Sequence, residues 1–172
     1  MDIQQRHNGK RVVFSEASFQ KIRLLIRDFL LRSRASMCIF ADVNGYPIAY
    51  GGDSRGVQIS SLTALAAGSF SATLEMARWL GEEQRFRFIY HEGAHRNLYL
   101  SNIGDNYLMI VLFDKSVPLG IIRLLTRQTT DRLNELLNDL RRKSDQATQL
   151  LDLEFRDLLD KELDRTFGLN RS

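Results

Sequence analysis

The fold is decided around residues 36–50, which have the sequence SMCIFADVNGYPIAY. The run 36–43 is rich in Ile, Phe and Val, and it predicts a strand because such side chains fit a pleated, half-buried surface. Asn44-Gly45 follows, the dipeptide that tolerates positive φ at both central positions of a tight hairpin turn. The return strand contains Pro47, which favours a sheet edge where its missing N–H costs little. The segment therefore predicts an antiparallel hairpin.

Helices are predicted on both sides of this hairpin. Residues 16–33 carry apolar side chains at helical spacing, and either Ser15 or Ser18 can cap the N-terminus. Residues 60–80 form the second helix, which ends at Gly81 because glycine adopts the left-handed conformation freely. The apolar positions on one face of the first helix are Phe19, Ile22, Ile26, Phe29 and Leu30.

Three further strands and a final helix complete the pattern. The strands are expected at residues 85–91, 97–103 and 107–113, and the short links between them require antiparallel neighbours. Pro118 suits the first turn of the last helix, where its missing N–H would be unpaired anyway. That helical pattern continues to about Phe167. The element order is α-β-β-α-β-β-β-α, an α/β fold of the α+β type.

Composition excludes several classes of protein. The 172 residues include 24 Lys and Arg against 21 Asp and Glu, and this net charge of +3 is too small to imply a nucleic-acid-binding surface. The sequence pI of about 9.2 leaves room for a local basic patch. A hydrophobic content of 44% supports a core, and the single cysteine, Cys38, excludes a disulfide framework. The longest apolar run, 107–113, is too short to cross a membrane, and no apolar signal region is visible at the N-terminus. We therefore expect a soluble cytoplasmic protein with no integral membrane segment.

Residues 91–95, HEGAH, match the H-E-x-x-H pattern of zinc hydrolases. That pattern requires a helix, which places both imidazoles on one face while the glutamate activates water. Here strand patterns run into and out of the motif, and Gly93 lies in its centre. A polar hairpin tip is therefore favoured over a zinc site with His91 and His95 as ligands and Glu92 as the base. No metal and no cofactor is expected.

No other arrangement predicts catalysis. The glycine-rich loop 51–56 precedes a helix, but it lacks the Gly-Lys-Ser/Thr ending of a phosphate-binding loop. Cys38 lies within an apolar strand, where a cysteine is usually a small core residue. Gly68-Ser69 lies inside a helix and not at a strand-to-helix elbow. We expect no enzyme and no catalytic residues.

Two helical surfaces are candidates for contacts. The second helix is rich in small residues, which allow a close approach either by its own sheet or by another subunit, and both remain open. Arg23, Arg27 and Arg34 recur on the first helix. A solvated charged face explains them better than an acidic partner or a membrane patch.

The chain is divided into an N-terminal segment (1–14), a domain (15–130) and a helical extension (131–172). In the extension, the polar stretch 141–146 separates two leucine-rich clusters. This pattern predicts either a long amphipathic helix that seeks a partner or a helix that bends near 141–146 and folds back. Docking on the domain or on a partner is favoured over a long parallel coiled coil, because the heptads are imperfect.

Several short strings occur in a specific order between residues 16 and 130. They are IFAD (39–42) with NG (44–45) and PIA (47–49), LGEE (80–83), HEG (91–93), RNLYL (96–100), and LG (119–120) with IR (122–123). In this order they resemble the Roadblock/dynein light chain domain family, and within it the bacterial MglB-type regulators of Ras-like small GTPases in cell polarity and motility.

The resemblance implies a roadblock-like five-stranded antiparallel sheet with the second helix on one face and the first and third on the other. It also implies a homodimer in which the third strands pair edge to edge and the two second helices lie side by side. Those helices would present a platform to a Ras-like small GTPase. The implied platform residues are Ser61, Ala64, Leu65, Gly68, Ser71, Ala72 and Glu75. The implied dimer edge consists of Phe86, Phe88, Ile89 and Tyr90.

The function implied is non-enzymatic activation or scaffolding of the GTPase, by favouring the conformation that completes the GTPase's own site. Arg78 is the nearest candidate for an arginine finger, and it lies outside the small-residue part of the helix. The alternative is a ligand-sensing domain of related layout that signals through its C-terminal helix. Few convergent polar groups are visible on the strands, which disfavours a ligand pocket.

Overall fold

The computed structural model of the chain describes residues 14–82 and 86–167, so nearly all of the expected N-terminal segment, and the first residue of the expected strand 85–91, lie outside the described residues. The helices are α1 (Glu16–Ser33), α2 (Ile59–Trp79) and α3 (Leu119–Phe167). The strands are β1 (Met37–Asp42), β2 (Pro47–Gly52), β3 (Phe88–His91), β4 (Arg96–Ile103) and β5 (Tyr107–Asp114). The order is the one expected from the sequence.

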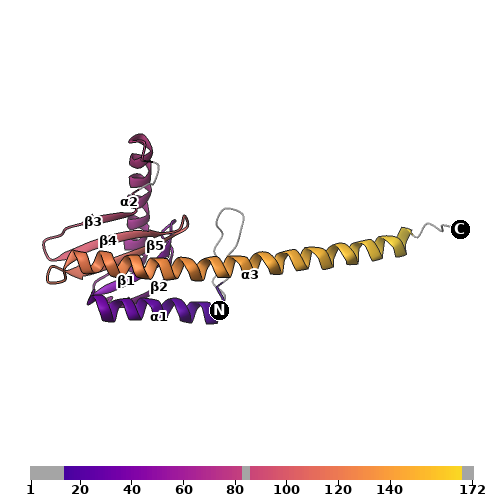
Figure 1. Cartoon of the computed structure of the whole chain (residues 1–172), viewed down its shortest axis with the longest axis horizontal. Helices are drawn as coiled ribbons and strands as arrows, with labels where there is room; N and C mark the ends of the chain where they lie inside the picture. Colours follow the sequence, from indigo (N-terminus) through magenta and orange to yellow (C-terminus); the bar gives the residue numbers. More distant parts are fainter. Residues whose placement is uncertain (1–13, 83–85, 168–172) are drawn as a thin grey trace.

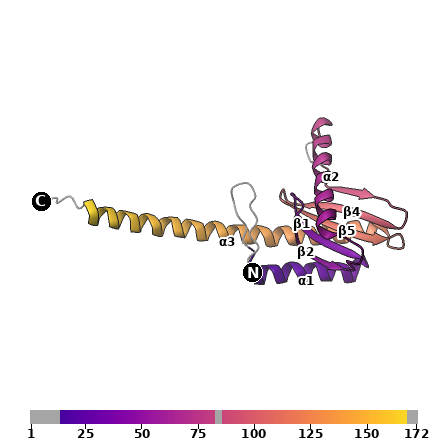
Figure 2. The same cartoon turned by 180° about the vertical axis from the view of Figure 1, so that it is seen from behind.

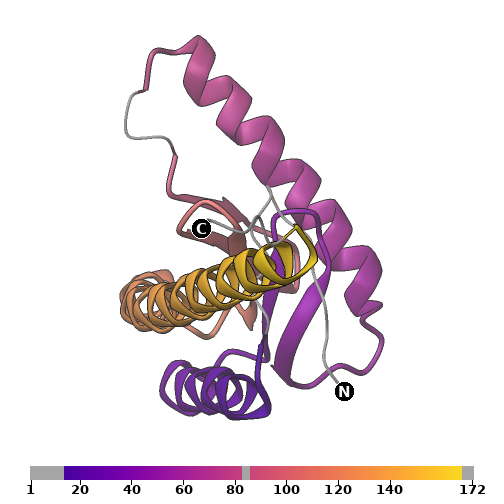
Figure 3. The same cartoon turned by 90° about the vertical axis from the view of Figure 1, so that its right-hand side faces the viewer.

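The five strands form one antiparallel sheet in the order β2-β1-β5-β4-β3. The strands β2 and β3 are therefore its edges, and β5 lies at its centre with seven of its eight residues buried. Figure 3 shows α2 on one side of the sheet and α1 with α3 on the other, and Figure 2 shows the same layers from behind. The expected α+β sandwich is confirmed.

Alternate residues of the strands supply two separate cores. Phe40, Met109 and Phe113 point to the side of α1 and α3, where they pack with Ile22 and Phe29 of α1. On the opposite side the sheet packs against α2 through a smaller cluster. Truncating one of the fully buried phenylalanines to alanine costs about 3–5 kcal/mol in comparable cores. The sheet therefore depends on a helix layer on each face.

The helix α1 is capped at both ends and tied to α3. The Ser15 hydroxyl accepts a hydrogen bond from the Ser18 N–H at 3.3 Å, and Arg34 adopts the left-handed conformation at the C-terminal end. Asp28 lies 3.7 Å from the guanidinium of Arg132 on α3. Exposed ion pairs of this kind contribute at most about 1 kcal/mol, so apolar packing holds the two helices together.

The β1–β2 hairpin differs from the expected two-residue turn. The loop between the strands has four residues, and the turn closes with a hydrogen bond from the Gly45 N–H to the carbonyl of Asp42. Only Gly45 has positive φ, at 89°, whereas Asn44 does not. The buried Asp42 carboxylate accepts from the N–H groups of Asn44 and Tyr46, at 3.0 and 2.8 Å. This carboxylate provides the turn geometry that a two-residue Asn-Gly turn would otherwise supply.

The helix α3 is continuous through residues 141–146, so of the two alternatives left open by the sequence, the helix that bends and folds back is wrong. Its packing against the domain reaches Leu137, which is buried, and Leu140, which is partly buried. Beyond that point the helix extends away from the domain (Figure 1). Among the described side chains of this extension, Leu150, Leu151, Leu153, Phe155 and Leu158 are exposed. None of the described helices has the length and hydropathy needed to span a membrane.

Candidate functional site

The helix α2 has one face on the sheet and one face in solvent. Phe70 is buried near the middle of its inner face. At 100° per residue, Gly68 falls on the opposite side of the helix, and it is exposed. A Cβ atom at Gly68 would meet no atom within 4 Å, so no part of the described chain approaches this point. The remaining buried residues of the inner face are Thr63, Ala66, Ala67 and Ala77.

The platform residues expected from the family resemblance all lie on the exposed face. Six of them surround Gly68 at helical spacings of three, four and seven residues, which makes one continuous surface. Most are small, so a second helix or a strand can approach the α2 backbone closely. The exposed residues of this platform are Ser61, Ala64, Leu65, Gly68, Ser71, Ala72 and Glu75.

The sequence-based platform omitted the large apolar residues at the end of α2. Met76, Trp79 and Leu80 are 54%, 89% and 71% exposed, and Leu65 is 74% exposed. The C-terminal end of α2 projects beyond the sheet (Figure 3). The signal was present in the sequence, because Ala72, Met76 and Trp79 continue the same helical stripe. A tryptophan so exposed on a projecting helix is typical of a protein–protein contact.

Arg78 lies beside this apolar end and forms an ion pair with Glu75, three residues before it on α2. Both side chains are largely exposed. The guanidinium is therefore directed along α2 toward a platform residue.

The strand β3 forms the free edge of the sheet next to β4. Phe86 precedes the strand, which begins at Phe88. The Phe88 ring stacks on the ring of Tyr99 of β4, with 5.2 Å between the ring centroids. The Cζ atom of Arg123 on α3 lies 4.9 Å from the centroid of the same Phe88 ring. Ile89 is half-buried and packs into the core on the α2 side. The outer backbone groups of such an edge can pair with another strand.

The motif at residues 91–95 lies at the end of β3 and in the β3–β4 loop, as the strand patterns predicted. Its turn requires glycine, because a Cβ atom on Gly93 would lie 2.3 Å from the carbonyl oxygen of Arg96. Glu92 instead lies 3.9 Å from the Lys115 ammonium group. Among the side chains that the structure describes, no group of three His, Cys, Asp or Glu could hold a metal ion.

The other sequence motifs are structural. In the β2–α2 loop, two side-chain hydrogen bonds from Arg55, at 2.8 and 2.7 Å, lower the pKa of Asp53. The loop is thus closed by its own ion pair. Cys38 is fully buried in β1, and this burial raises the pKa of its thiol well above the usual value. It behaves as a core residue, as its sequence context predicted.

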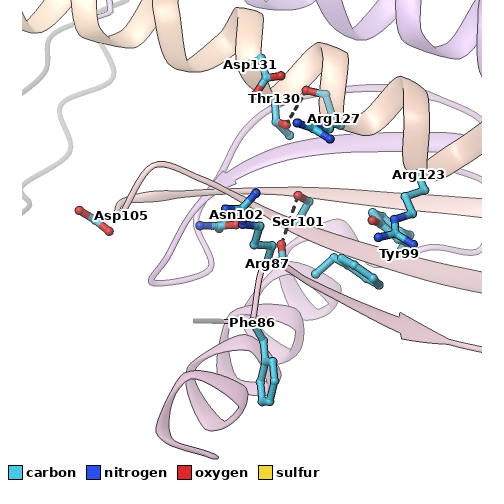
Figure 4. A pocket seen from close by; sticks show the side chains of 11 residues that line it. Phe86, Arg87, Tyr99, Ser101, Asn102, Asp105, Arg123, Arg127, Thr130 and Asp131 are labelled. Carbon is cyan, nitrogen blue, oxygen red and sulfur yellow. Dashed lines mark hydrogen bonds between the residues drawn. The ribbon is translucent and has the colours of Figure 1, made fainter. Parts of the chain in front are cut away.

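A polar cavity between α3 and the β3–β4 strands was not expected from the sequence. It has a volume of about 530 Å³, and its walls include Arg87, Ser101, Asn102, Arg123 and Arg127 (Figure 4). These residues come from three separate segments of the chain. The strands themselves contribute few of these polar groups, as expected, because the arginines come from α3 and from the segment before β3.

The matching family is the Roadblock/LC7 domain, whose pattern covers residues 21–113, more than half of the chain. The chain belongs to the Roadblock/LC7 family. Its five-stranded sheet and its helix layers are thus those of a roadblock domain.

Solved structures of MglB share this fold. Myxococcus xanthus MglB superposes with a TM-score of 0.70 at 29% identity, over 74% of this chain and 95% of that one. The gliding protein MglB of Thermus thermophilus gives 0.68 at 24% identity, over 73% and 95%. An uncharacterised Aquifex aeolicus protein is 21% identical over 158 residues, which are 89% of this chain and 93% of that protein.

Proposed function

We propose that this roadblock protein is a homodimeric regulator of a Ras-like small GTPase and that it presents the exposed face of α2 to the GTPase. The observation that carries the proposal is the small-residue surface around Gly68, which ends in the exposed Met76 and Trp79. The likeness to Myxococcus xanthus MglB supports the same function. The regulator itself performs no chemistry.

The regulator acts by shifting the GTPase toward its hydrolysing conformation. A GTPase whose active conformation is rarely populated hydrolyses faster when a partner binds that conformation more tightly. The α2 platform offers shape and apolar area for such binding. It offers no catalytic group, because its described residues are small, apolar or, at Glu75, negatively charged.

The direct test is GTP hydrolysis by a Ras-like GTPase from the same organism, with and without this protein. We expect a rise in rate that saturates near two chains per GTPase. Stable co-elution without a rise would make the protein a scaffold. No rise and no co-elution would contradict the proposal.

Arg78→Ala is expected to change the stimulated rate less than about threefold. An arginine finger supplied in trans is worth about 10³–10⁵ in kcat, so its removal would be unmistakable. Arg78 pairs with Glu75 of its own helix, and the proposed population-shift mechanism gives it no finger role. Single-turnover hydrolysis measures the effect. A fall of a thousandfold with binding unchanged would assign the finger to Arg78 and replace the population-shift mechanism.

The proposed dimer pairs β3 of one chain with β3 of a second. Ile89→Lys places an unpaired charge in that edge, and we expect dimer affinity to fall about a hundredfold, or about 3 kcal/mol. Tyr50→Lys is the matched control, because Tyr50 is exposed on β2 at the opposite edge. Sedimentation equilibrium measures the dimer dissociation constants of both variants. An Ile89→Lys variant that circular dichroism shows to be folded and that remains dimeric would exclude β3 as the interface.

A further inference from the structure

We propose that the cavity between α3 and the β3–β4 strands binds a small multivalent anion, such as an organic phosphate. This site is separate from the α2 platform, since the two lie on opposite faces of the sheet. Anion binding there therefore does not depend on the proposed GTPase partner.

The first support is the arrangement of charge. Arg123 and Arg127 are four residues apart on α3, so their side chains leave the same face of the helix. Both line the cavity, and Arg87 lines it from the segment before β3. Figure 4 shows Arg127 reaching from α3 toward the wall that carries Arg87. The guanidinium groups of Arg123 and Arg127 can hold an anionic group through charge-assisted hydrogen bonds.

The second support is that the guanidinium groups of Arg123 and Arg127 form no ion pair with the described residues. Among the ion pairs of the described residues, none involves the guanidinium of Arg123 or Arg127. Arg123 instead lies over the Phe88 ring, which fixes its direction while leaving its N–H donors available. Asp105 and Asp131 also line the cavity, so its lining carries three positive and two negative side chains. Figure 4 shows Asp131 beside Arg127 on α3, so the lining as a whole keeps one net positive charge.

The third support is the neutral part of the lining. Ser101, Asn102 and Thr130 add hydroxyl and amide groups to the same walls. The Ser101 hydroxyl contacts the carbonyl oxygen of Arg87 at 3.4 Å, and the Thr130 hydroxyl donates to the carbonyl of Arg127 at 2.9 Å. The cavity volume of about 530 Å³ lies within the usual range of about 300–1,000 Å³ for small-molecule sites. Because the Ser101 and Thr130 hydroxyls already donate to backbone carbonyls, the donors for a small phosphate compound come from the arginines, and the cavity volume accommodates it.

The test is calorimetric titration of the full chain with pyrophosphate, at an ionic strength held constant with sodium chloride. We expect saturable binding and a matching rise in melting temperature. The double variant Arg123→Gln/Arg127→Gln should weaken binding at least tenfold, because each guanidinium supplies charge-assisted hydrogen bonds. The matched control is Arg23→Gln/Arg27→Gln, which removes two exposed arginines with the same spacing from α1.

Three outcomes would overturn the proposal. They are the absence of saturable binding by the unaltered chain, an equal loss in both double variants, and full binding by the Arg123→Gln/Arg127→Gln variant. If loss of the Arg123–Phe88 contact prevents that variant from folding, Arg127→Gln alone replaces it. It should still weaken pyrophosphate binding several-fold and leave the circular dichroism spectrum unchanged.

Discussion

Gly68→Arg is expected to abolish stimulation of the GTPase while leaving the roadblock domain folded. A side chain at this position meets no atom of the described chain within 4 Å, so the domain itself accommodates it. A partner that lies close to the α2 backbone cannot accommodate the arginine side chain. The long charged side chain would separate the two surfaces at their centre, and we expect binding to weaken by about 3 kcal/mol or more, a hundredfold or more.

Two controls for Gly68→Arg test whether the effect depends on the position of the arginine and on the size of the side chain. Gly120→Arg makes the same change at an exposed glycine of α3 that likewise meets no atom within 4 Å, on the other side of the sheet. It should stimulate hydrolysis as the unaltered chain does. Gly68→Ala should bind normally and raise the free energy of unfolding by up to about 1 kcal/mol, because alanine is the better helix former. Full stimulation by a folded Gly68→Arg variant would move the partner surface away from α2.

Gly45→Ala is expected to destabilise the roadblock domain strongly. Gly45 has a φ of 89°, which costs an L-residue about 1–2 kcal/mol. A Cβ atom there would also lie 2.6 Å from the Cα of Ala64 on α2, closer than real contacts allow. Because backbone lies on both sides of this contact, the β1–β2 hairpin must move away from α2. We expect a total loss of about 3 kcal/mol or more.

Gly56→Ala isolates the backbone part of this effect. Gly56 has a φ of 72°, but a Cβ atom there would meet nothing within 4 Å. It should lose only about 1–2 kcal/mol. For a domain of this size, the difference corresponds to several degrees in melting temperature, which calorimetry resolves. Equal losses of unfolding free energy in Gly45→Ala and Gly56→Ala would mean that the close contact between the hairpin and α2 contributes nothing to the destabilisation.

The proposed anion site would add a second input to the same domain. The helix that supplies Arg123 and Arg127 continues directly into the extension beyond Leu140. A ligand held between α3 and β3 would therefore contact both the helix and the proposed dimer edge. This geometry gives the ligand-sensing alternative a specific location.

Most of the local structure could be predicted from the sequence. The apolar spacing of residues 16–33 predicts α1 with its observed bounds, and the small-residue stretch 60–80 predicts α2 to within one residue at each end. Helical periodicity alone did not decide which face of α2 points outward, and the structure places Gly68 on the exposed face. The helix bounds depend on the period of the apolar side chains and on capping, and both are set by residues close together in the sequence.

Other features were decided only by tertiary structure. The conformation of the turn at Gly45 depends on the buried Asp42 carboxylate and on contact with α2. The sequence allowed α3 either to continue or to bend near 141–146, and the structure shows that it continues. The cavity between α3 and the β3–β4 strands joins side chains that are up to 45 residues apart in the sequence, between Phe86 and Asp131. Sequence period determines which face of an element is apolar. Only the packed sheet determines which distant polar side chains meet, because that depends on strand order, register and the path of α3 across them.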